Sequence, residues 1–286
     1  MGRQVSGTRS SEVTVNAQQR LGALEQDPEV RVVVFNSAVP DFFLAHYDIA
    51  AAPSRSATST APTGLSAWLD VLARIAEGPF VSIAKIRGRA RGAGSEFALA
   101  CDMRFASREH AVLSQPEIGL GLVAGGAPTH RLPFLTGRGR ALEIMLTGQD
   151  YDADLAERYG YVNRSVPDAA LDGFVADMAV RIASFDKAAL TEVKAFVGEV
   201  SLPAHDLQAC TSRAFWASAA RPAGSGSTPH RNRAWAGPAT SRCTWGSTCP
   251  VSTTRPGRDG HRPPTTSTPR HRFHRTAAHQ HPKELP

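Results

Sequence analysis

Residues 80–102 read FVSIAKIRGRARGAGSEFALACD, and this stretch decides the fold class. Its apolar start contains several β-branched residues and predicts a buried strand over 80–86. Three glycines within residues 88–94 then predict a tight turn that leads into a helix over 95–100. A strand, a glycine-rich turn and a helix in this order indicate an α/β domain. Free N–H groups at the start of such a helix can bind a phosphate or a developing oxyanion.

The sequence on either side continues the alternation of helices and strands. Helical spacing of apolar residues predicts helices over residues 10–25, 65–77, 128–135, 139–146, 152–159 and 171–183. Short apolar runs predict strands over residues 30–35, 103–106, 111–113 and 161–165. Residues 36–47 and 50–64 contain turn-forming residues and are expected to form loops. We therefore expect one α/β domain over residues 1–220.

The charge and the composition both change near Arg221. Residues 221–286 hold ten Arg and one Lys against Asp259 and Glu284, a net charge of +9, whereas the whole chain carries +6. Ten of the 20 prolines lie in this segment, and only 13 of its 66 residues are apolar. It can bury too little apolar surface to offset the entropy of ordering, so a disordered basic tail is expected. The basic charge therefore does not indicate a nucleic-acid function for the domain.

Composition also argues against a membrane or secreted protein. The chain has no run of about 18 apolar residues and no apolar signal segment near its N-terminus, so a cytoplasmic protein is expected. Four cysteines are too few for a disulfide scaffold, and Cys101 and Cys210 are expected to be reduced and inert. Cys243 and Cys249 lie near histidines, but their spacing matches no common zinc motif, so no metal site is expected.

Two glutamates accompany glycine-rich segments and are the candidate catalytic groups. Glu96 lies in the first turn of the helix predicted after the glycine-rich turn, and Glu117 follows Pro116 in LSQPEIGLGLVAGG. Carboxyl groups beside free backbone amides suit acid/base chemistry next to a carbonyl. The alternative is that Glu96 caps its helix and Glu117 is a solvated loop residue. A dinucleotide site is disfavoured, because Phe97 stands where that fingerprint needs a small residue.

Four segments, in this order and spacing, resemble the enoyl-CoA hydratase/isomerase family, the crotonase superfamily. They read ARGAGSEFALACDMRFAS, LSQPEIGLG, GGAPTHRLPFLTGRGRALEIMLTG and YDADLAERYGYVNRSVP, and the resemblance extends from about residue 11 to residue 221. It implies a crotonase-like ββα spiral core followed by C-terminal helices. It also implies an acyl-CoA thioester substrate, with coenzyme A as part of that substrate and with no separate cofactor or metal. A homotrimer or hexamer is implied if the fold is intact.

The resemblance assigns roles to individual residues. The backbone N–H groups of Tyr47 and Ala93 match the oxyanion hole that binds the thioester carbonyl. Glu96 and Glu117 match the two glutamates that bind the attacking water and move protons, and Gly125 matches a glycine whose amide positions this water. The remaining matches are substrate-binding positions of the two loops: Ala45, His46, Asp48, Gly92 and Gly94.

These roles favour an enoyl-CoA hydratase, which adds water across the C2=C3 bond of a 2-enoyl-CoA thioester. In this hypothesis Glu96 activates the water and Glu117 delivers the proton to C2. A 3-enoyl to 2-enoyl isomerase is the alternative within the same fold, because that chemistry can run with one glutamate and the same oxyanion hole. A catalytically impaired member that binds acyl-CoA is a further alternative.

Several positions depart from the family pattern. His46 and Ala93 stand where glycine is usual, and a Cβ at a position that needs positive φ would misaim an N–H donor. His46 is interpreted as a solvated loop residue, with a substrate contact as the alternative. Pro128 replaces a glycine but suits the first turn of a helix. No lysine follows Asp48 to meet CoA phosphates, so three arginines either supply that charge or form a solvated rim: Arg87, Arg89 and Arg91.

Both ends of the chain also depart from the family. The family's N-terminal strand pair is missing before the first predicted helix, and the basic tail stands where its C-terminal helices continue after residue 220. We therefore expect a domain truncated at both ends, and an out-of-frame origin is the hypothesis for residues 221–286. A genuine basic tail that binds anionic partners is the alternative.

Overall fold

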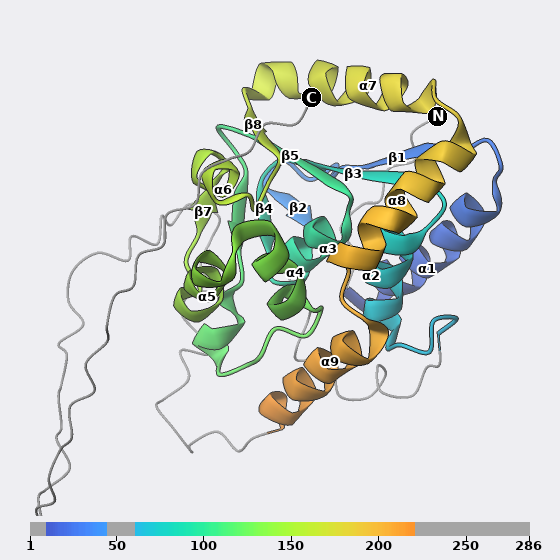
Figure 1. Cartoon of the computed structure of the whole chain (residues 1–286). Coiled ribbons are helices and arrows are strands. Elements are labelled where there is room, and N and C mark those ends of the chain that lie inside the picture. Colours follow the sequence, from blue (N-terminus) through green and yellow to red (C-terminus); the bar gives the residue numbers. More distant parts are fainter. Residues whose placement is uncertain (1–9, 45–60, 221–286) are drawn as a thin grey trace, which may run out of the picture. The chain divides into compact units, whose positions relative to one another are not determined.

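Two four-stranded sheets organise the chain in the computed structural model, which describes residues 10–44 and 61–220, with side chains from residue 17 (Figure 1). The first sheet is parallel and has the order β1 (Val32–Phe35), β3 (Val81–Ile86), β5 (Met103–Ser107) and β8 (Arg164–Val166). The second has the order β2 (Phe42–Leu44), β4 (Arg89–Arg91), β6 (Val112–Ser114) and β7 (Tyr151–Asp152), and its β6–β7 pair is antiparallel.

From β1 to β6, consecutive strands alternate between the two sheets, and a helical segment follows each pair of strands. α2 (Ala67–Glu77) follows β1 and β2, α3 (Ala93–Ala100) follows β3 and β4, and the 3-10 helix η1 (Pro116–Leu120) follows β5 and β6. Parallel strands need such crossovers, because a tight turn cannot join them. The predicted α/β class and the ββα spiral are therefore confirmed.

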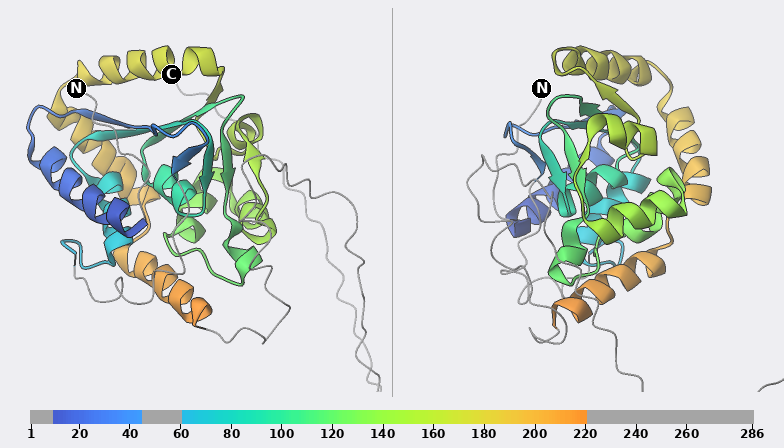
Figure 2. Two further views of the ribbon diagram at one scale, coloured as in Figure 1. Left: turned by 180° about the vertical axis from the view of Figure 1, so that it is seen from behind. Right: turned by 90° about the vertical axis from the view of Figure 1, so that its left-hand side faces the viewer.

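The other helices surround this core. They are α1 (Ser10–Gln26), α4 (Pro128–Thr136), α5 (Arg138–Thr147), α6 (Ala153–Tyr159), α7 (Asp168–Ala183), α8 (Lys187–Ser201) and α9 (His205–Ala219). Figure 1 and both views of Figure 2 place α7 and α9 at opposite ends of the described residues. Within this part of the chain, none of the helices has the length and apolar character needed to cross a membrane.

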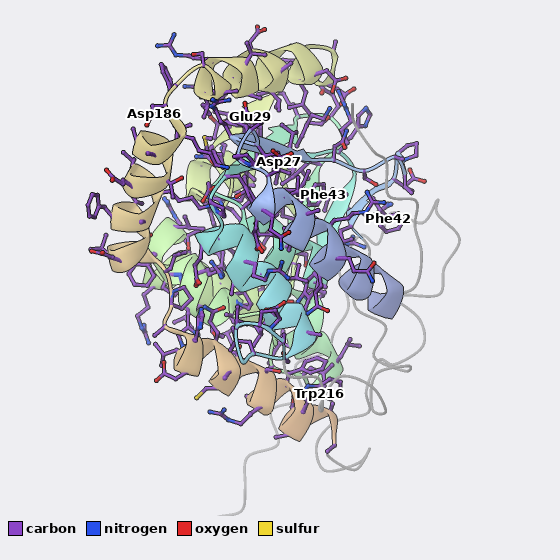
Figure 3. The ribbon with its side chains drawn as sticks, turned by 90° about the vertical axis from the view of Figure 1, so that its right-hand side faces the viewer. Asp27, Glu29, Phe42, Phe43, Asp186 and Trp216 are labelled. Carbon is purple, nitrogen blue, oxygen red and sulfur yellow. The ribbon has the colours of Figure 1, made fainter. Side chains whose placement is uncertain are left out.

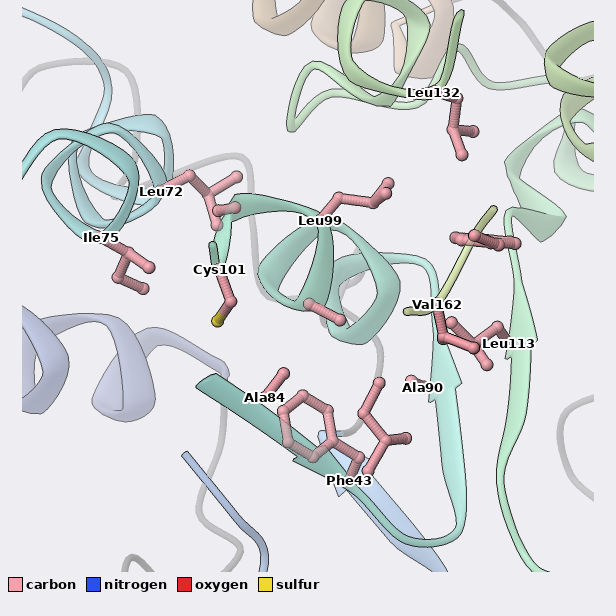
Figure 4. Close-up of a cluster of buried hydrophobic side chains, with 14 of the residues drawn as sticks. Phe43, Leu72, Ile75, Ala84, Ala90, Leu99, Cys101, Leu113, Leu132 and Val162 are labelled. Atoms are coloured by element: carbon pink, nitrogen blue, oxygen red, sulfur yellow. The ribbon is translucent and has the colours of Figure 1, made fainter. Parts of the chain in front are cut away.

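Helices pack on both faces of the first sheet. Side chains of neighbouring strand residues point to opposite faces, so Ile83 and Phe105 pack beneath α7. Ala84 and Ala106, one residue further along the same strands, point to the other face and join the main core. Figure 4 shows Leu99 of α3 in this core, between the side chains of α2 and those of the second sheet. The core thus holds α3 firmly where its first turn meets the glycine-rich turn.

The prediction of a loop over residues 36–47 was wrong in part, because β2 lies within it, and β4 was also missed. Each strand has three residues, and they pair with one another, Phe42 opposite Arg89. Their stability comes from this pairing more than from a local pattern. Phe43 is buried while Phe42 lies at the surface, as Figure 3 shows. Gly88, with φ of +68°, makes the turn that brings β4 back beside β2.

Other differences lie at the ends of elements and in the C-terminal helices. α3 begins at Ala93 instead of residue 95, and the last strand lies at residues 164–166 instead of 161–165. α8 and α9 were not predicted. α8 has apolar residues at helical spacing, but Val193, Val197 and Val200 are exposed, and none of its residues is fully buried. α9 buries polar residues, Gln208 and Thr211 among them, and so lacks the apolar stripe of a core helix.

Lys194 fastens α8 to the core. Its Nζ donates to the carbonyl oxygens of Ile75 at 3.0 Å and Phe80 at 2.7 Å, and it lies 2.9 Å from Asp102 Oδ2. Asp102 Oδ2 also accepts the backbone N–H and the hydroxyl of Ser82. This network joins α8 to α2, to the start of β3 and to the chain before β5, and only 11% of the Lys194 side chain is exposed.

The Lys194→Met variant is expected to lose about 1 to 3 kcal/mol of unfolding free energy, because the variant leaves two carbonyls and a carboxylate without their shared donor. Urea unfolding followed by circular dichroism measures this loss. Lys187→Met is the control on the same helix, since Lys187 Nζ also donates to two carbonyls, those of Asp27 and Pro28, but at the surface. An equal loss in both variants would contradict the role of Lys194.

Candidate active site

The site begins at the first turn of α3. Gly92 has φ of +54° and ends β4, and Ala93 starts the helix. A Cβ on Gly94 would overlap the carbonyl oxygen of Leu44 at the end of β2. The second sheet and α3 therefore meet at a point where only glycine fits. Ala93 itself has no positive φ, so its Cβ causes no backbone strain, and the expected conflict at this position does not arise.

Glu96 is the buried carboxyl of this turn. Two neutral donors hold it: Trp68 Nε1–H donates to Oε2 at 2.9 Å and the Gly126 N–H donates to Oε1 at 2.7 Å. Burial raises the pKa of Glu96, while the hydrogen bonds from Trp68 and the amides of Gly126 and Gly125 oppose that rise because they favour the charged form. The alternative of a simple helix cap does not describe this carboxyl, which is bonded to groups outside its own helix.

The loop before α4 supplies one of these donors. A Cβ on Gly126 would overlap the Glu96 carboxyl, so glycine is required here. Ala127 follows with φ of 65°, the one non-glycine residue with positive φ among those described, and Pro128 takes the first helical position as predicted. Backbone strain of this kind persists where the surrounding structure imposes it, often at functional sites. Here it accompanies an amide that is aimed at a buried carboxyl.

α9 holds the same loop from the other side. Thr211 Oγ1 donates to the carbonyl of Gly125 at 3.0 Å, and Ser218 Oγ accepts the N–H of Val123 at 3.2 Å. A Cβ on Gly125 would lie 3.1 Å from Cβ of Phe215. The last described helix therefore fixes the loop that carries the Glu96 donor.

Glu117 faces the start of α3 from η1. A Cβ on Gly92 would lie 2.8 Å from Glu117 Oε1, which places this carboxyl beside the glycine-rich turn. The residue as a whole is half-buried, yet its Oε2 is fully buried and has no hydrogen-bond partner among the described residues. Burial, with a smaller contribution from the negative charge of Glu96, raises the pKa of Glu117 to about 8. The alternative of a solvated loop residue does not fit this buried oxygen.

The two carboxyls therefore have unequal environments. Three N–H donors favour the charged form of Glu96, although its burial outweighs them and raises its pKa. Glu117 has one carboxyl oxygen, Oε2, without a hydrogen-bond partner among the described residues, and with a pKa raised to about 8 it keeps its proton at neutral pH. Pairs of acidic groups whose surroundings separate their protonation in this way commonly divide the roles of base and acid. The arrangement can accept a proton at one carboxyl and donate one from the other.

The structure brings together six of the residues singled out in the sequence: Gly92, Ala93, Gly94, Glu96, Glu117 and Gly125. The other four, Ala45, His46, Tyr47 and Asp48, lie outside the described residues, as does residue 221 onward. Leu44, which directly precedes them in sequence, contacts the first turn of α3 through its carbonyl. The described end of β2 is therefore next to the candidate site.

Two of the three rim arginines already have carboxylate partners. Arg87 pairs with Asp168 at 2.7 Å and with Asp172 at 2.8 Å, and Arg91 Nε donates to Asp150 at 2.8 Å. The guanidinium of Arg89 lies instead over the ring of Phe42, 5.6 Å from its centroid. These pairs favour the solvated-rim interpretation for Arg87 and Arg91.

Sequence reasoning missed Trp68 and Gly126. Trp68 lies in α2, 28 residues before Glu96, and no spacing rule connects them. The available signal was chemical, since an indole N–H that is partly buried usually has an acceptor. Gly126 directly follows Gly125, the glycine that the sequence analysis names. The conformation of the loop decides that the N–H of Gly126 donates to Glu96 Oε1.

Two features concern metal binding and the reactivity of the cysteines. The described residues contain no group of three or more His, Cys, Asp or Glu placed to bind one metal ion. Cys101 is buried, which raises the pKa of its thiol far above the usual range, as expected for an inert core cysteine. Cys210 is a free, exposed thiol on helix α9.

Comparisons with known proteins support this picture. The sequence profile of the family described as enoyl-CoA hydratase/isomerase matches residues 3–214. A crystallised candidate enoyl-CoA hydratase from Streptomyces avermitilis is similar in structure, with a TM-score of 0.70 and 44% identity, covering 76% of this chain and 79% of that chain. An enoyl-CoA hydratase from Bacillus anthracis has a TM-score of 0.62 and 27% identity, covering 73% and 80%.

One curated relative is much longer than the matched region. The fatty acid oxidation complex subunit alpha of Aliivibrio fischeri is 36% identical over 158 residues. The match covers 55% of this chain and 23% of that protein.

Proposed function

Because this chain belongs to the enoyl-CoA hydratase/isomerase family, we propose that it adds water across the C2=C3 bond of a 2-enoyl-CoA thioester. The observation that carries the proposal is the unequal pair of carboxyls. N–H donors oppose the rise that burial causes in the pKa of Glu96, whereas burial raises the pKa of Glu117 to about 8 and keeps it protonated at neutral pH. Hydration needs both states at once, a base for the water and an acid for the carbon. An isomerase, which can use a single glutamate, does not need this difference.

The thioester carbonyl is proposed to bind at the first turn of α3. First-turn N–H groups have no acceptor within their own helix, so the N–H of Ala93 is available to an oxyanion. The N–H of Tyr47 is the proposed second donor. Leu44, which lies against Gly94, precedes Tyr47 by three residues in the sequence, and this supports the choice. Two such donors stabilise the enolate oxygen that forms during the reaction.

In the proposed reaction the water oxygen bonds to C3 while Glu96 takes one water proton. The C2=C3 electron pair moves toward the thioester and forms an enolate. Glu117 then gives its proton to C2, and the thioester carbonyl is restored. The product gains one hydroxyl and one hydrogen, and the proton taken by Glu96 balances the proton lost from Glu117.

The remaining site residues are proposed to hold water and substrate. The amide of Gly125 acts beside Glu96, where it already opposes the rise of that pKa. The proposed substrate-binding positions are Ala45, His46, Asp48, Gly92 and Gly94. Coenzyme A enters as part of the substrate. A homotrimer or hexamer is proposed from the family, and exposed apolar side chains on α4 and α5 support it: Phe134, Leu142 and Leu146.

The proposal predicts loss of the ultraviolet absorbance of a conjugated 2-enoyl-CoA when the purified chain is added. We expect kcat/KM to fall above about pH 8, because Glu117 donates only while protonated and its pKa is raised to about 8. Reaction rates measured from pH 5 to 9.5, each corrected for a sample without enzyme, test for this fall in kcat/KM.

Two other outcomes of the same assay would replace the hydratase proposal. An absorbance gain with a 3-enoyl-CoA, together with no loss from the 2-enoyl-CoA, would indicate the isomerase. Binding of acyl-CoA without either change would indicate the impaired family member.

A further inference from the structure

We propose that Trp68 is a positioning residue of this site, whose indole N–H fixes the direction of the Glu96 carboxyl. The inference rests on the proposed hydration, in which Glu96 accepts a proton from water. Trp68 lies in the first turn of α2 and reaches Glu96 Oε2 with its Nε1 at 2.9 Å. The Gly126 N–H holds Oε1 at 2.7 Å. Donors from two separate elements therefore hold the two oxygens, which prevents rotation of the carboxyl.

Aromatic packing fixes the direction of the indole. The ring of Trp68 lies 6.4 Å from that of Phe97, the residue that follows Glu96, with an interplanar angle of 31°. Phe97 in turn makes edge contacts with Phe35 at 5.1 Å and Phe43 at 6.1 Å. The indole thus packs against Phe97 of α3, and rings from β1 and β2 in turn hold Phe97. Its N–H points at the carboxyl because the ring has packed neighbours.

The chemical type of this donor suits a base. An indole N–H donates one hydrogen bond, accepts none and carries no charge. A lysine or arginine at the same place would orient the carboxylate equally well, but a full positive charge would make that carboxylate a much weaker base. A carboxylate offers about four lone-pair sites, and Trp68, Gly126 and Gly125 occupy at most three of those of Glu96. A remaining lone pair can take the proton of the attacking water.

The Trp68→Phe variant tests this role, since phenylalanine retains an aromatic ring against Phe97 but has no N–H. We expect kcat to fall about 10-fold with KM changed less than twofold, because the lost bond orients a proton acceptor and does not bind substrate. The acid limb of the pH profile is expected to move to higher pH. The N–H favours the charged form of Glu96, so its loss raises that pKa, and a higher pH is then needed to ionise the base.

Trp216→Phe is the matched control. Trp216 lies on α9, is also partly buried, and packs against Phe215 with its ring (Figure 3). This variant also removes an indole N–H, one that makes no hydrogen bond to another described residue. We expect its kcat and pH profile to match those of the wild-type chain. A Trp68→Phe variant that behaves like this control would overturn the proposal.

A second measurement does not need turnover. In the chain labelled with 15N-tryptophan, the indole N–H resonance of Trp68 is expected to move in the Glu96→Gln variant and to titrate with pH in the wild-type chain. An indole resonance that neither moves in Glu96→Gln nor titrates with pH would overturn the proposal, even if Trp68→Phe failed to fold. Conversely, a responsive indole in a chain that hydrates no 2-enoyl-CoA would confirm the contact and would reject the proposed function.

Discussion

The Glu117→Gln variant is expected to lose about 100- to 10,000-fold of the hydration rate. Glutamine has nearly the same shape as glutamate but carries no proton that it can give to C2. The wild-type carboxyl holds that proton at neutral pH because burial raises its pKa to about 8. Hydration of a 2-enoyl-CoA under saturating substrate measures the loss. We expect the loss in kcat, since the proton moves after the substrate has bound.

The Glu117→Gln substitution is also expected to change how the stability of the fold depends on pH. A carboxyl with a raised folded pKa binds its proton more tightly in the folded than in the unfolded chain, where the pKa is about 4.3. Stability from this group is complete below about pH 4.3 and is lost as the pH rises to about 8. The glutamine variant is therefore expected to lose less stability than the wild-type chain over this range. Urea unfolding at pH 5 and pH 8 measures the difference.

Glu192→Gln is the matched control for both measurements, because Glu192 is exposed on α8. It is expected to leave the rate and the pH dependence of stability unchanged. Full activity in Glu117→Gln would reject the assignment of Glu117 as the acid. An inactive variant that also fails to fold would instead assign the residue a structural role.

The Gly126→Ala variant is expected to lose about 100-fold of the hydration rate. The new Cβ would overlap the Glu96 carboxyl, so that either the carboxyl or the loop must move. Both movements break the hydrogen bond from the Gly126 N–H to Oε1. A displacement of about 1 Å at a catalytic group can cost about 100-fold in rate. Steady-state kinetics on a 2-enoyl-CoA measures this effect.

Gly173→Ala controls for the change of glycine to alanine. Gly173 lies within α7, and a Cβ there has no neighbouring atom within 4 Å. Alanine in a helix interior is more stable than glycine by about 0.5 to 1 kcal/mol, so this variant is expected to be slightly more stable and fully active. Unimpaired turnover in Gly126→Ala would show that the rate does not depend on the orientation of Glu96.

Parts of the site could be predicted because they depend on residue types close in sequence. Glu96 and Glu117 stand out as carboxyls beside glycines in apolar surroundings, and the strand, turn and helix around Gly92 follow from local patterns. Other parts depend on contacts between distant segments. β2 and β4 are short strands that stabilise one another by pairing. The importance of α9 becomes clear only from its hydrogen bond to the carbonyl of Gly125.

The amino-acid sequence alone determined the α/β class and the two candidate carboxyls, since periodicity, glycine placement and residue type are local properties. Only the tertiary structure decided that Trp68 and Gly126 hold Glu96, and that Glu117 keeps its proton. The physical reason is that hydrogen-bond direction and loss of solvent arise where separate elements pack together. The protonation of a carboxyl depends on those neighbours, and the spacing of residues along the chain does not specify them.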